Sequence, residues 1–489
     1  MIGCGYSGAV SALEAAGRGA SVCILEKAPH PGGISICSAG GLRITTNEDA
    51  ALQYLEATNK GTTPSPVLAA LAKGMARLPE YVRQLAKINN AQVSVRPWNA
   101  NYPFPGYDSF GFVYIDNIPD VDIAQQYPHV KGNPAGALLF NVLEANLKQK
   151  EIPVYLSTPV VSLCSKEGRV TGVELANGEK LEASRGVILA CGGFEADHEM
   201  QRQFWPGGPC DSAAYKYNTG DGIRMAQAMG ADLWHMWHYH ACYGFSPPSA
   251  QYPFGIRIKR LPDWVPDKKT NDLPPMTWVL LDQKGKRFMN EYEPYVHDTG
   301  ARPMSVYDPI ARKYPRNPAF LITDEPGRLS YPLGKPLYND PKAKMDWSPD
   351  NSKEIENGTI VKAKTIRGLA EKLGLPAEAT FKSIEKWNNL CRDKLDPTFS
   401  RPPASMHSIS TPPFYGAPMV PVISNTQGGP RHDERQRVLN PYGEPIPGLY
   451  AVGECGSCFG FLYMSGGNLA ECFVGGQIAG IETSRHTIE

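Results

Sequence analysis

The spacing of hydrophobic residues near the start of the chain predicts a strand, a tight turn, a helix and a second strand. Alanine and larger apolar side chains recur at helical spacing from Ser7 to Ala16, directly after a glycine-rich turn. Residues 20–26 then form an apolar run that ends in the acid Glu26, which is the pattern of a buried strand. This order of elements is typical of an α/β fold.

The end of the chain shows a similar change of pattern. Leu449 to Val452 reads as a short buried strand, which breaks at Gly453, and a helix is expected from about Gly466. Glycines at a junction between a strand and a helix let the backbone approach a ligand closely and leave helix N–H groups available. Tyr463 lies in the loop before this helix. The stretch is therefore predicted to bring a ligand and a reactive side chain together.

The middle of the chain alternates between periodic and irregular segments. Helices are expected within 47–96 and at 136–149, 223–231, 366–373 and 377–390. Strands are expected at 154–163, 169–175 and 181–193, and a hairpin at 276–290. Residues 97–133 are rich in aromatic side chains without any period, which predicts a long loop. Its rings either pack in the core or form the wall of an apolar pocket.

Composition narrows the possible functions. The 489 residues carry a formal net charge of zero, without the basic excess that nucleic-acid binding requires. A chain of this length is expected to form two or three domains. No apolar run reaches the ~20 residues of a membrane span, and no signal peptide is visible. The first strand is short, because Met1 and Ile2 run directly into the glycine turn, so we expect additional residues upstream in the natural protein.

The eleven cysteines are scattered along the chain and fit a reducing compartment, so a cytoplasmic location is expected. Cys455 and Cys458 form one CxxC pair without a second pair that would complete a zinc site. His235, His238 and His240 lie close together, but no carboxylate or cysteine frame accompanies them. We therefore expect no metal.

The turn at residues 3–8 carries the spacing of a dinucleotide site. It reads Gly-Cys-Gly-Tyr-Ser-Gly, which matches GxGxxG between a strand and a helix. Glycines allow the tight turn and the close approach of a diphosphate, which rests on the helix N-terminus. An acid about 20 residues later suits a ribose hydroxyl. The predicted contacts of this unit are Gly3, Gly5, Tyr6, Ser7, Gly8 and Glu26.

The segment after Glu26 favours FAD over NAD, because two further Gly-Gly pairs offer a second backbone clamp for a flavin nucleotide. Its predicted contacts are Lys27, Gly32, Gly33, Ser35, Ser38, Gly40 and Gly41. These motifs resemble the flavoprotein subunits of the fumarate reductase and succinate dehydrogenase superfamily, which includes the 3-ketosteroid dehydrogenases. No histidine lies between Gly33 and Gly41, so FAD is expected to be non-covalent.

The resemblance implies an α/β fold, in which a Rossmann-like FAD-binding domain is split in sequence by an inserted α+β substrate (cap) domain. The boundaries expected are 1–232 and 417–489 for the FAD-binding domain and 233–416 for the substrate domain. It also implies further cofactor contacts at Val161, Gly192, Gly193, Asp221, Gly453, Glu454, Gly467, Asn468 and Leu469.

Departures from the fumarate reductase pattern indicate the substrate. Those enzymes bind a dicarboxylate with arginines and histidines. In this chain the corresponding stretches read Asn-Thr-Gln-Gly-Gly from Asn425, Tyr-Val-His-Asp from Tyr295, and Tyr-Met-Ser from Tyr463. The run Asn-Glu-Tyr-Glu-Pro-Tyr at 290–295 is similar to the 3-ketosteroid dehydrogenases. The Tyr-Met-Ser-Gly-Gly run resembles the branch that acts between carbons 4 and 5, the 3-ketosteroid 4-ene (5α) dehydrogenases.

By this resemblance Tyr463, with Ser465 as a relay, takes a proton from carbon 4, and Tyr295 assists at the keto oxygen or at Tyr463. The hydrogen on carbon 5 leaves as hydride to flavin N5. The partners expected are an apolar ketone, a steroid by this resemblance, and a separate electron acceptor, because no haem or iron–sulfur cysteine spacing is present.

Other readings remain open at this point. The alternatives are a 3-ketosteroid 1-dehydrogenase, a fumarate-reductase-like reductase of another enone, and an FAD-binding protein without substrate chemistry.

Overall fold

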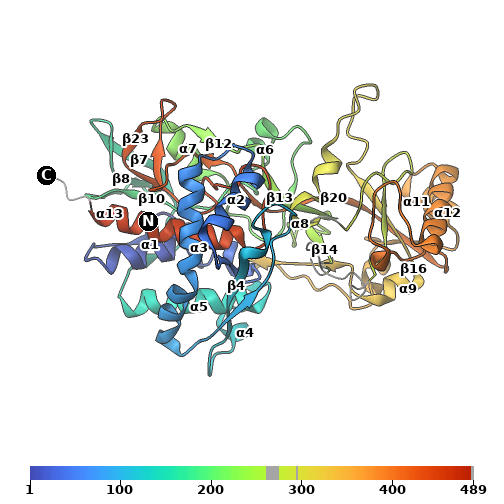
Figure 1. Ribbon diagram of the computed structural model, residues 1–489, viewed down its shortest axis with the longest axis horizontal. Helices are drawn as coiled ribbons and strands as arrows, with labels where there is room; N and C mark the ends of the chain where they lie inside the picture. The colour runs from blue at the N-terminus through green and yellow to red at the C-terminus, as the bar shows by residue number, and fades with distance from the viewer. Residues whose placement is uncertain (260, 262–274, 293–295, 486–489) are drawn as a thin grey trace.

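The computed structural model describes residues 1–259, 261, 275–292 and 296–485, and Figure 1 shows it as two lobes joined by long strands. The lobe with both chain ends contains a parallel sheet. Its strands β1 (Ile24–Leu25) and β6 (Val154–Tyr155) pair in parallel, as do β10 (Val187–Leu189) and β23 (Pro445–Ala451). Ile2 joins the two pairs through parallel bridges to Leu25 and Leu189. β22 (Arg437–Leu439) adds an antiparallel edge.

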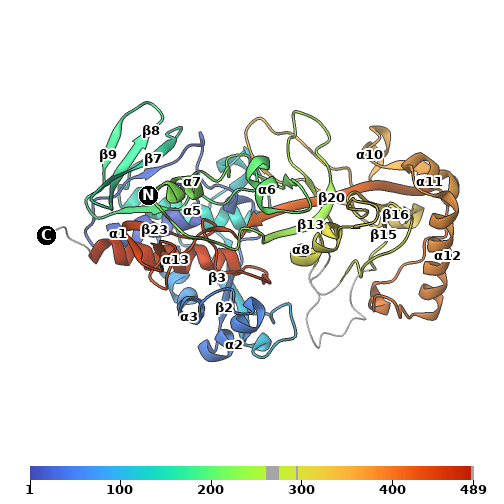
Figure 2. The same cartoon turned by 90° about the horizontal axis from the view of Figure 1, so that it is seen from above.

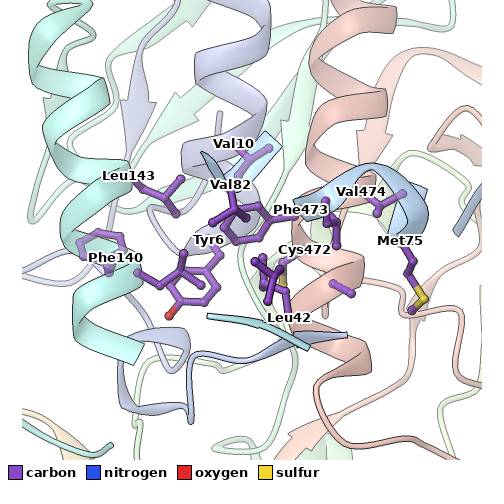
Figure 3. Packing of buried hydrophobic residues seen from close by; sticks show 14 of the residues in the cluster. Tyr6, Val10, Leu42, Met75, Val82, Phe140, Leu143, Cys472, Phe473 and Val474 are labelled. Atoms are coloured by element: carbon purple, nitrogen blue, oxygen red, sulfur yellow. The ribbon is translucent and has the colours of Figure 1, made fainter. Parts of the chain in front are cut away.

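Helices pack against this sheet around a large apolar core. Helix α1 starts at the predicted glycine turn, and α13 starts beside the predicted loop. The helices of this lobe are α1 (Tyr6–Ala16), α2 (Glu48–Asn59), α3 (Ser65–Ala86), α4 (Ile123–Gln126), α5 (Pro134–Gln149), α6 (His198–Phe204), α7 (Asp221–Ala228) and α13 (Gly467–Arg485). Figure 3 shows Tyr6 and Phe473 in the centre of this core, between α1, α5 and α13. Their burial fixes the first and last helices against each other.

Two smaller antiparallel sheets complete this lobe. One contains β2 (Leu42–Thr45), β4 (Phe110–Asn117) and β3 (Gln92–Pro97) in the order β2-β4-β3. The other contains β7 (Val160–Lys166), β8 (Arg169–Leu175) and β9 (Lys180–Glu182), and it lies at the same end as α1 (Figure 2). The expected loop 97–133 thus contains a strand, β4, and the expected helical stretch 47–96 ends in the strand β3. The sequence did not indicate β4 because the residues around Phe112 are apolar on both faces of the strand, so polar and apolar residues do not alternate there.

The second lobe is built on strand β20 (Phe414–Thr426), which runs between the two lobes (Figures 1 and 2). Its first half pairs with β16 (Ala319–Asp324) and β19 (Val361–Ala363), and its second half pairs with β13 (Tyr239–Phe245) and β11 (Asp211–Ser212). The predicted boundary between residues 416 and 417 therefore falls inside a continuous strand.

The same sheet also contains β15 (Val279–Leu281), β14 (Ile256–Ile258) and β17 (Gly334–Lys335), in the order β15-β16-β20-β13-β14-β17. The remaining elements are β5 (Val130–Lys131), β12 (Leu233–Trp234), α8 (Val296–Thr299), α9 (Glu325–Ser330), β18 (Tyr338–Asn339), α10 (Ser352–Glu356), α11 (Ile366–Leu373), α12 (Ala377–Asp393) and β21 (Gly429–Pro430). The predicted α/β fold class is confirmed. Among the described helices, none is both long and apolar enough to cross a bilayer.

Candidate active site

The turn before α1 forms one end of a groove along the parallel sheet. Gly3 has a φ of +100°, and a Cβ on Gly8 would lie 2.0 Å from the Gly3 carbonyl oxygen. Only glycine fits at these two positions. No side chain caps the start of α1, so its first N–H groups face the groove without a local acceptor. This arrangement suits the negative charge of a diphosphate.

Glu26 lies at the end of β1 in the same groove. Its two carboxylate oxygens accept hydrogen bonds from the backbone N–H groups of Cys4 and Ala28, at 2.8 Å each. Burial raises the pKa of Glu26, although these two bonds favour its charged form. Lys27 pairs with Asp221 at the start of α7 and also donates to Thr219. The acid and the glycine turn are thus held together as a ribose and diphosphate site requires.

The predicted cofactor residues divide among three positions. Those that line the groove are Gly3, Gly5, Ser7, Glu26, Lys27, Gly33, Ser35, Gly192, Asp221 and Glu454. A larger adjoining cavity of about 680 Å³ is lined by Ser35, Ser38, Gly41, Glu454, Asn468 and Leu469, with Ser35 and Glu454 shared between the two. Gly8, Gly32, Gly40, Gly193, Gly453 and Gly467 line neither the groove nor the cavity.

Two predicted contacts do not present their side chains to the groove. The Tyr6 ring lies in the core (Figure 3), where its hydroxyl donates to the Gly136 carbonyl at 2.7 Å. Val161 is 55% exposed, and its neighbour Val160 lines the groove instead. Alternation along β7 turns the two valines to opposite faces, which the sequence Val-Val does not resolve. At Tyr6 only the backbone is placed to meet the cofactor.

The groove and the cavity together fit an elongated nucleotide such as FAD. Ser35, Glu454 and Cys472 line both spaces, so the two are continuous. The groove offers backbone N–H groups and an acid for the nucleotide end. The cavity at the start of α13 offers a helix N-terminus, whose positive dipole end stabilises a reduced flavin.

The walls of the cavity resolve the two readings of the aromatic segment 97–133. Tyr102 and Phe110 are core residues, whereas Trp98, Phe112 and Tyr114 line the cavity. Both readings are therefore correct for different rings.

Arginines also line the cavity, which the sequence did not reveal. Arg96 pairs with Asp116 and lies over the Tyr114 ring at 4.9 Å, and Arg257 reaches the cavity from β14. The two arginines come from two separate sheets, so their spacing along the chain does not indicate that they line one cavity. The cavity is thus aromatic with a charged part.

Tyr463 and Ser465 both line this cavity, as predicted from their loop. The Tyr463 side chain is 5% exposed, and its hydroxyl oxygen accepts a hydrogen bond from the Gly466 N–H at 3.1 Å. The Ser465 backbone is held on both sides, since its N–H donates to Asn101 and its carbonyl accepts from Arg43. The loop therefore fixes the Tyr463 hydroxyl in the wall of the cavity.

A buried carboxylate, Asp298, fixes the other side of this loop and was not predicted as a site residue. It accepts hydrogen bonds from the Tyr463 backbone N–H at 3.0 Å and from the Tyr102 hydroxyl. Burial by itself raises the pKa of Asp298, but the positive charge of Arg302 and the nearby His238 ring outweigh it and lower the pKa to about 2. Asp298 is therefore charged at neutral pH and anchors the loop.

A chain of side-chain amides leads away from Tyr463. The centroid of the His240 ring lies 4.3 Å from that of the Tyr463 ring, and the His240 Nδ1 bonds to the side-chain Oδ1 of Asn425 at 3.0 Å. The Asn425 amide donates to Asn468, which in turn donates to Glu471. The Asn468 side chain thus bonds to other protein groups, and its contact with the cofactor stays a prediction.

The three clustered histidines point to different partners. His235 bonds to the Ser457 carbonyl and His238 to the Phe459 carbonyl, whereas His240 bonds to Asn425. His235 and His238 thus bond to the backbone of the loop that carries Tyr463, and the His240 ring packs beside Tyr463. Tyr295, the third predicted catalytic residue, lies outside the described residues.

The glycine turn yields a prediction that separates cofactor binding from folding. A Cβ on Gly5 would meet only Ser35 Oγ at 3.7 Å and the Gly32 carbonyl at 4.0 Å, and the φ of Gly5, −84°, suits alanine. Gly5→Ala should therefore fold normally but place a methyl group in the groove. We expect its FAD affinity, measured by fluorescence titration of the apoprotein, to fall by at least about tenfold, because the backbone can no longer approach the diphosphate.

The control is Gly8→Ala, whose methyl group would clash inside the protein. This variant should lower the denaturation midpoint of the apoprotein, whereas Gly5→Ala should not. Normal FAD affinity in Gly5→Ala would contradict the placement of the diphosphate.

Comparison with known proteins gives a consistent result. The family model for the FAD binding domain matches residues 1–469. The 3-oxosteroid 1-dehydrogenase of Mycolicibacterium smegmatis is 28% identical, and the alignment covers 99% of this chain and 96% of that protein.

Two solved structures share the fold. The 3-ketosteroid delta1-dehydrogenase of Sterolibacterium denitrificans has a TM-score of 0.81 at 24% identity, with 99% of this chain and 98% of that chain covered. The 3-ketosteroid-delta4-(5alpha)-dehydrogenase of Rhodococcus jostii RHA1 has a TM-score of 0.67 at 21% identity, with 99% and 96% covered.

Proposed function

Because the chain belongs to the FAD binding domain family and is an FAD-dependent oxidoreductase, we propose that it introduces a C=C bond beside the ketone of a 3-ketosteroid. The prediction of FAD from the Gly-Gly pairs is confirmed by the family. The steroid is proposed from the cavity and from the named relative, which is a 3-oxosteroid 1-dehydrogenase.

The single observation that carries the proposal is the position of Tyr463. Its side chain lines an aromatic-walled cavity that adjoins the nucleotide groove. The volume of about 680 Å³ lies in the usual range of roughly 300–1,000 Å³ for small-molecule sites. A proton acceptor beside a largely apolar surface is what removal of hydrogen next to a ketone requires.

The proposed roles follow from these contacts. Tyr463 accepts the proton from the carbon next to the ketone, and the N–H bond from Gly466 holds its hydroxyl in place. Ser465 relays the proton onward, and Tyr295 assists from the part of the chain that the structure leaves undescribed. Bound FAD, which we propose to be non-covalent, supplies the acceptor for the hydride that leaves the neighbouring carbon. The two electrons then pass to a separate acceptor.

The position of the new double bond is the finer part of the proposal. We assign it to carbons 4 and 5 because Ser465 follows Tyr463 by two residues in the lining of the cavity, as the sequence resemblance implies. The named relative supports the alternative, which is a bond between carbons 1 and 2.

Turnover of a saturated 3-ketosteroid with an artificial electron acceptor, followed by product identification by NMR, decides between the two. A 4-ene product is expected from wild-type protein. A 1-ene product would replace our assignment with 1-dehydrogenation while leaving the steroid as substrate.

A second candidate, reduction of another enone, is favoured by the arginines of the cavity. Arg96 and Arg257 could hold a carboxylate, as a fumarate-reductase-like enzyme requires. Reoxidation of the photoreduced protein by enone acids, without any reaction with steroids, would support this reading. Inertness toward both would leave an FAD-binding protein without substrate chemistry.

A further inference from the structure

Two buried glutamates meet at the ends of neighbouring strands beside the FAD groove. Glu195 follows β10 and Glu454 follows β23, and these strands pair in parallel with Leu189 opposite Ala451. Because both strands end at the same sheet edge, the acids emerge side by side. Glu195 is fully buried, and Glu454 is 8% exposed and lines both the groove and the cavity.

The hydrogen bonds of this pair require a shared proton. Glu195 Oε1 accepts from the Asn218 amide at 2.6 Å, and Glu454 Oε1 accepts from the Thr426 N–H at 2.7 Å. Glu195 Oε2 is buried and receives no N–H or O–H donor from the described residues. The Glu454 carboxyl acts directly on that of Glu195, which places the two groups next to each other. Two acceptors bond to each other only when one of them carries a proton.

The surroundings favour retention of that proton. In the described part of the chain neither acid takes part in an ion pair. The other titratable groups shown to interact with the pair include Glu471, Tyr215, Cys455 and Cys472. All of these are acids, and none supplies a positive charge. Burial raises the pKa of Glu454 to about 7, and burial and the charge of Glu454 raise the pKa of Glu195 well above its usual value.

We propose that Glu195 is a positioning residue for the cofactor: as a neutral acid it donates its Oε2 hydrogen to Glu454 and thereby orients the Glu454 carboxyl group toward the hydroxyl groups of FAD. Thr426 fixes one oxygen of Glu454 and Glu195 fixes the group from the second side. The cofactor hydroxyls then meet a group that is already held in place. This inference does not depend on which substrate the protein oxidises.

The pair also links cofactor binding to pH. The folded protein holds protons on this pair that the unfolded chain releases at lower pH, because both pKa values are raised on folding. The resulting contribution to stability is therefore present at low pH and is lost as the pH rises through about 7. Above that range two buried negative charges repel each other and disturb the Glu454 orientation.

The test is FAD titration of the apoprotein between about pH 6 and pH 9, followed by fluorescence, together with its denaturation midpoint over the same range. Glu195→Gln keeps a donor toward Glu454 but has no proton to lose. We expect it to bind FAD within about threefold of wild type at neutral pH and to lose the alkaline weakening of both affinity and stability. Glu195→Ala lacks the donor and should bind FAD at least about tenfold more weakly at every pH.

Glu482→Gln serves as the matched control, because Glu482 is a buried glutamate paired with Arg435 that lines neither the groove nor the cavity. It should retain the FAD affinity of wild type and the alkaline loss of that affinity. Wild-type FAD affinity in Glu195→Ala would overturn the proposal. An unchanged alkaline loss of affinity in Glu195→Gln would overturn it as well, and this isosteric variant keeps the test decisive if the alanine variant fails to fold.

Discussion

Replacement of Tyr463 by phenylalanine should lower kcat for 3-ketosteroid oxidation by roughly 10²–10⁴-fold, the usual contribution of a general base. The phenol oxygen is the group that the Gly466 N–H supports in the cavity, and phenylalanine removes only this oxygen. FAD should remain bound, because the groove contacts are unaffected. The measurement is steady-state turnover beside the flavin absorbance spectrum of the purified variant.

Tyr114→Phe is the matched control for this experiment. Tyr114 lines the same cavity from strand β4, but it lies outside the loop that precedes α13. Its variant should retain kcat within about tenfold of wild type, a smaller loss than removal of a base causes. Equal losses in the two variants, or near-normal turnover in Tyr463→Phe, would remove Tyr463 as the base.

The largest effect on stability is expected from Glu291→Ala in the second lobe. Glu291 is fully buried and pairs with Arg287 at 2.8 Å and with Arg401 at 3.2 Å, and both arginines lie over the Trp387 ring. The alanine variant leaves the buried Arg401 without its ion-pair partner and leaves Arg287 with Asp396 alone. Removal of one member of such a pair costs about 3–5 kcal/mol of the free energy of unfolding. Urea denaturation followed by tryptophan fluorescence measures the change.

Glu378→Ala provides the comparison for that variant. Glu378 also pairs with an arginine, Arg367, but both side chains are largely exposed. Its removal should leave the urea midpoint close to that of wild type, because exposed ion pairs contribute little. A similar small shift in Glu291→Ala would show that the buried pair does not hold this lobe together.

The part of the site that was predictable from the sequence is the part built from contiguous residues. The turn at residues 3–8 and Glu26 follow from local spacing, since a strand, a glycine turn and a helix fix their own geometry. Tyr463 and Ser465 were found in the same way, from their place just before a helix start. In these stretches the order of residues alone places the groups.

The groups that the sequence did not reveal are those brought together by tertiary packing. Asp298 and Tyr102 are far apart in the chain and meet only in the folded protein. The pairing of Glu195 with Glu454 depends on the parallel register of β10 and β23. The sequence did not reveal strand β20, which contains Pro418 and Pro421, because its pairing with four other strands overrides the low strand preference of proline.

The most direct test of the central claim is anaerobic mixing of the FAD-loaded protein with a saturated 3-ketosteroid in a stopped-flow spectrometer. Our account predicts rapid loss of the oxidised flavin absorbance, with one unsaturated steroid formed for each FAD reduced. The same reaction in Tyr463→Phe should be slower by roughly 10²–10⁴-fold. Flavin that stays oxidised with every saturated 3-ketosteroid offered, in protein that dithionite reduces normally, would contradict the account.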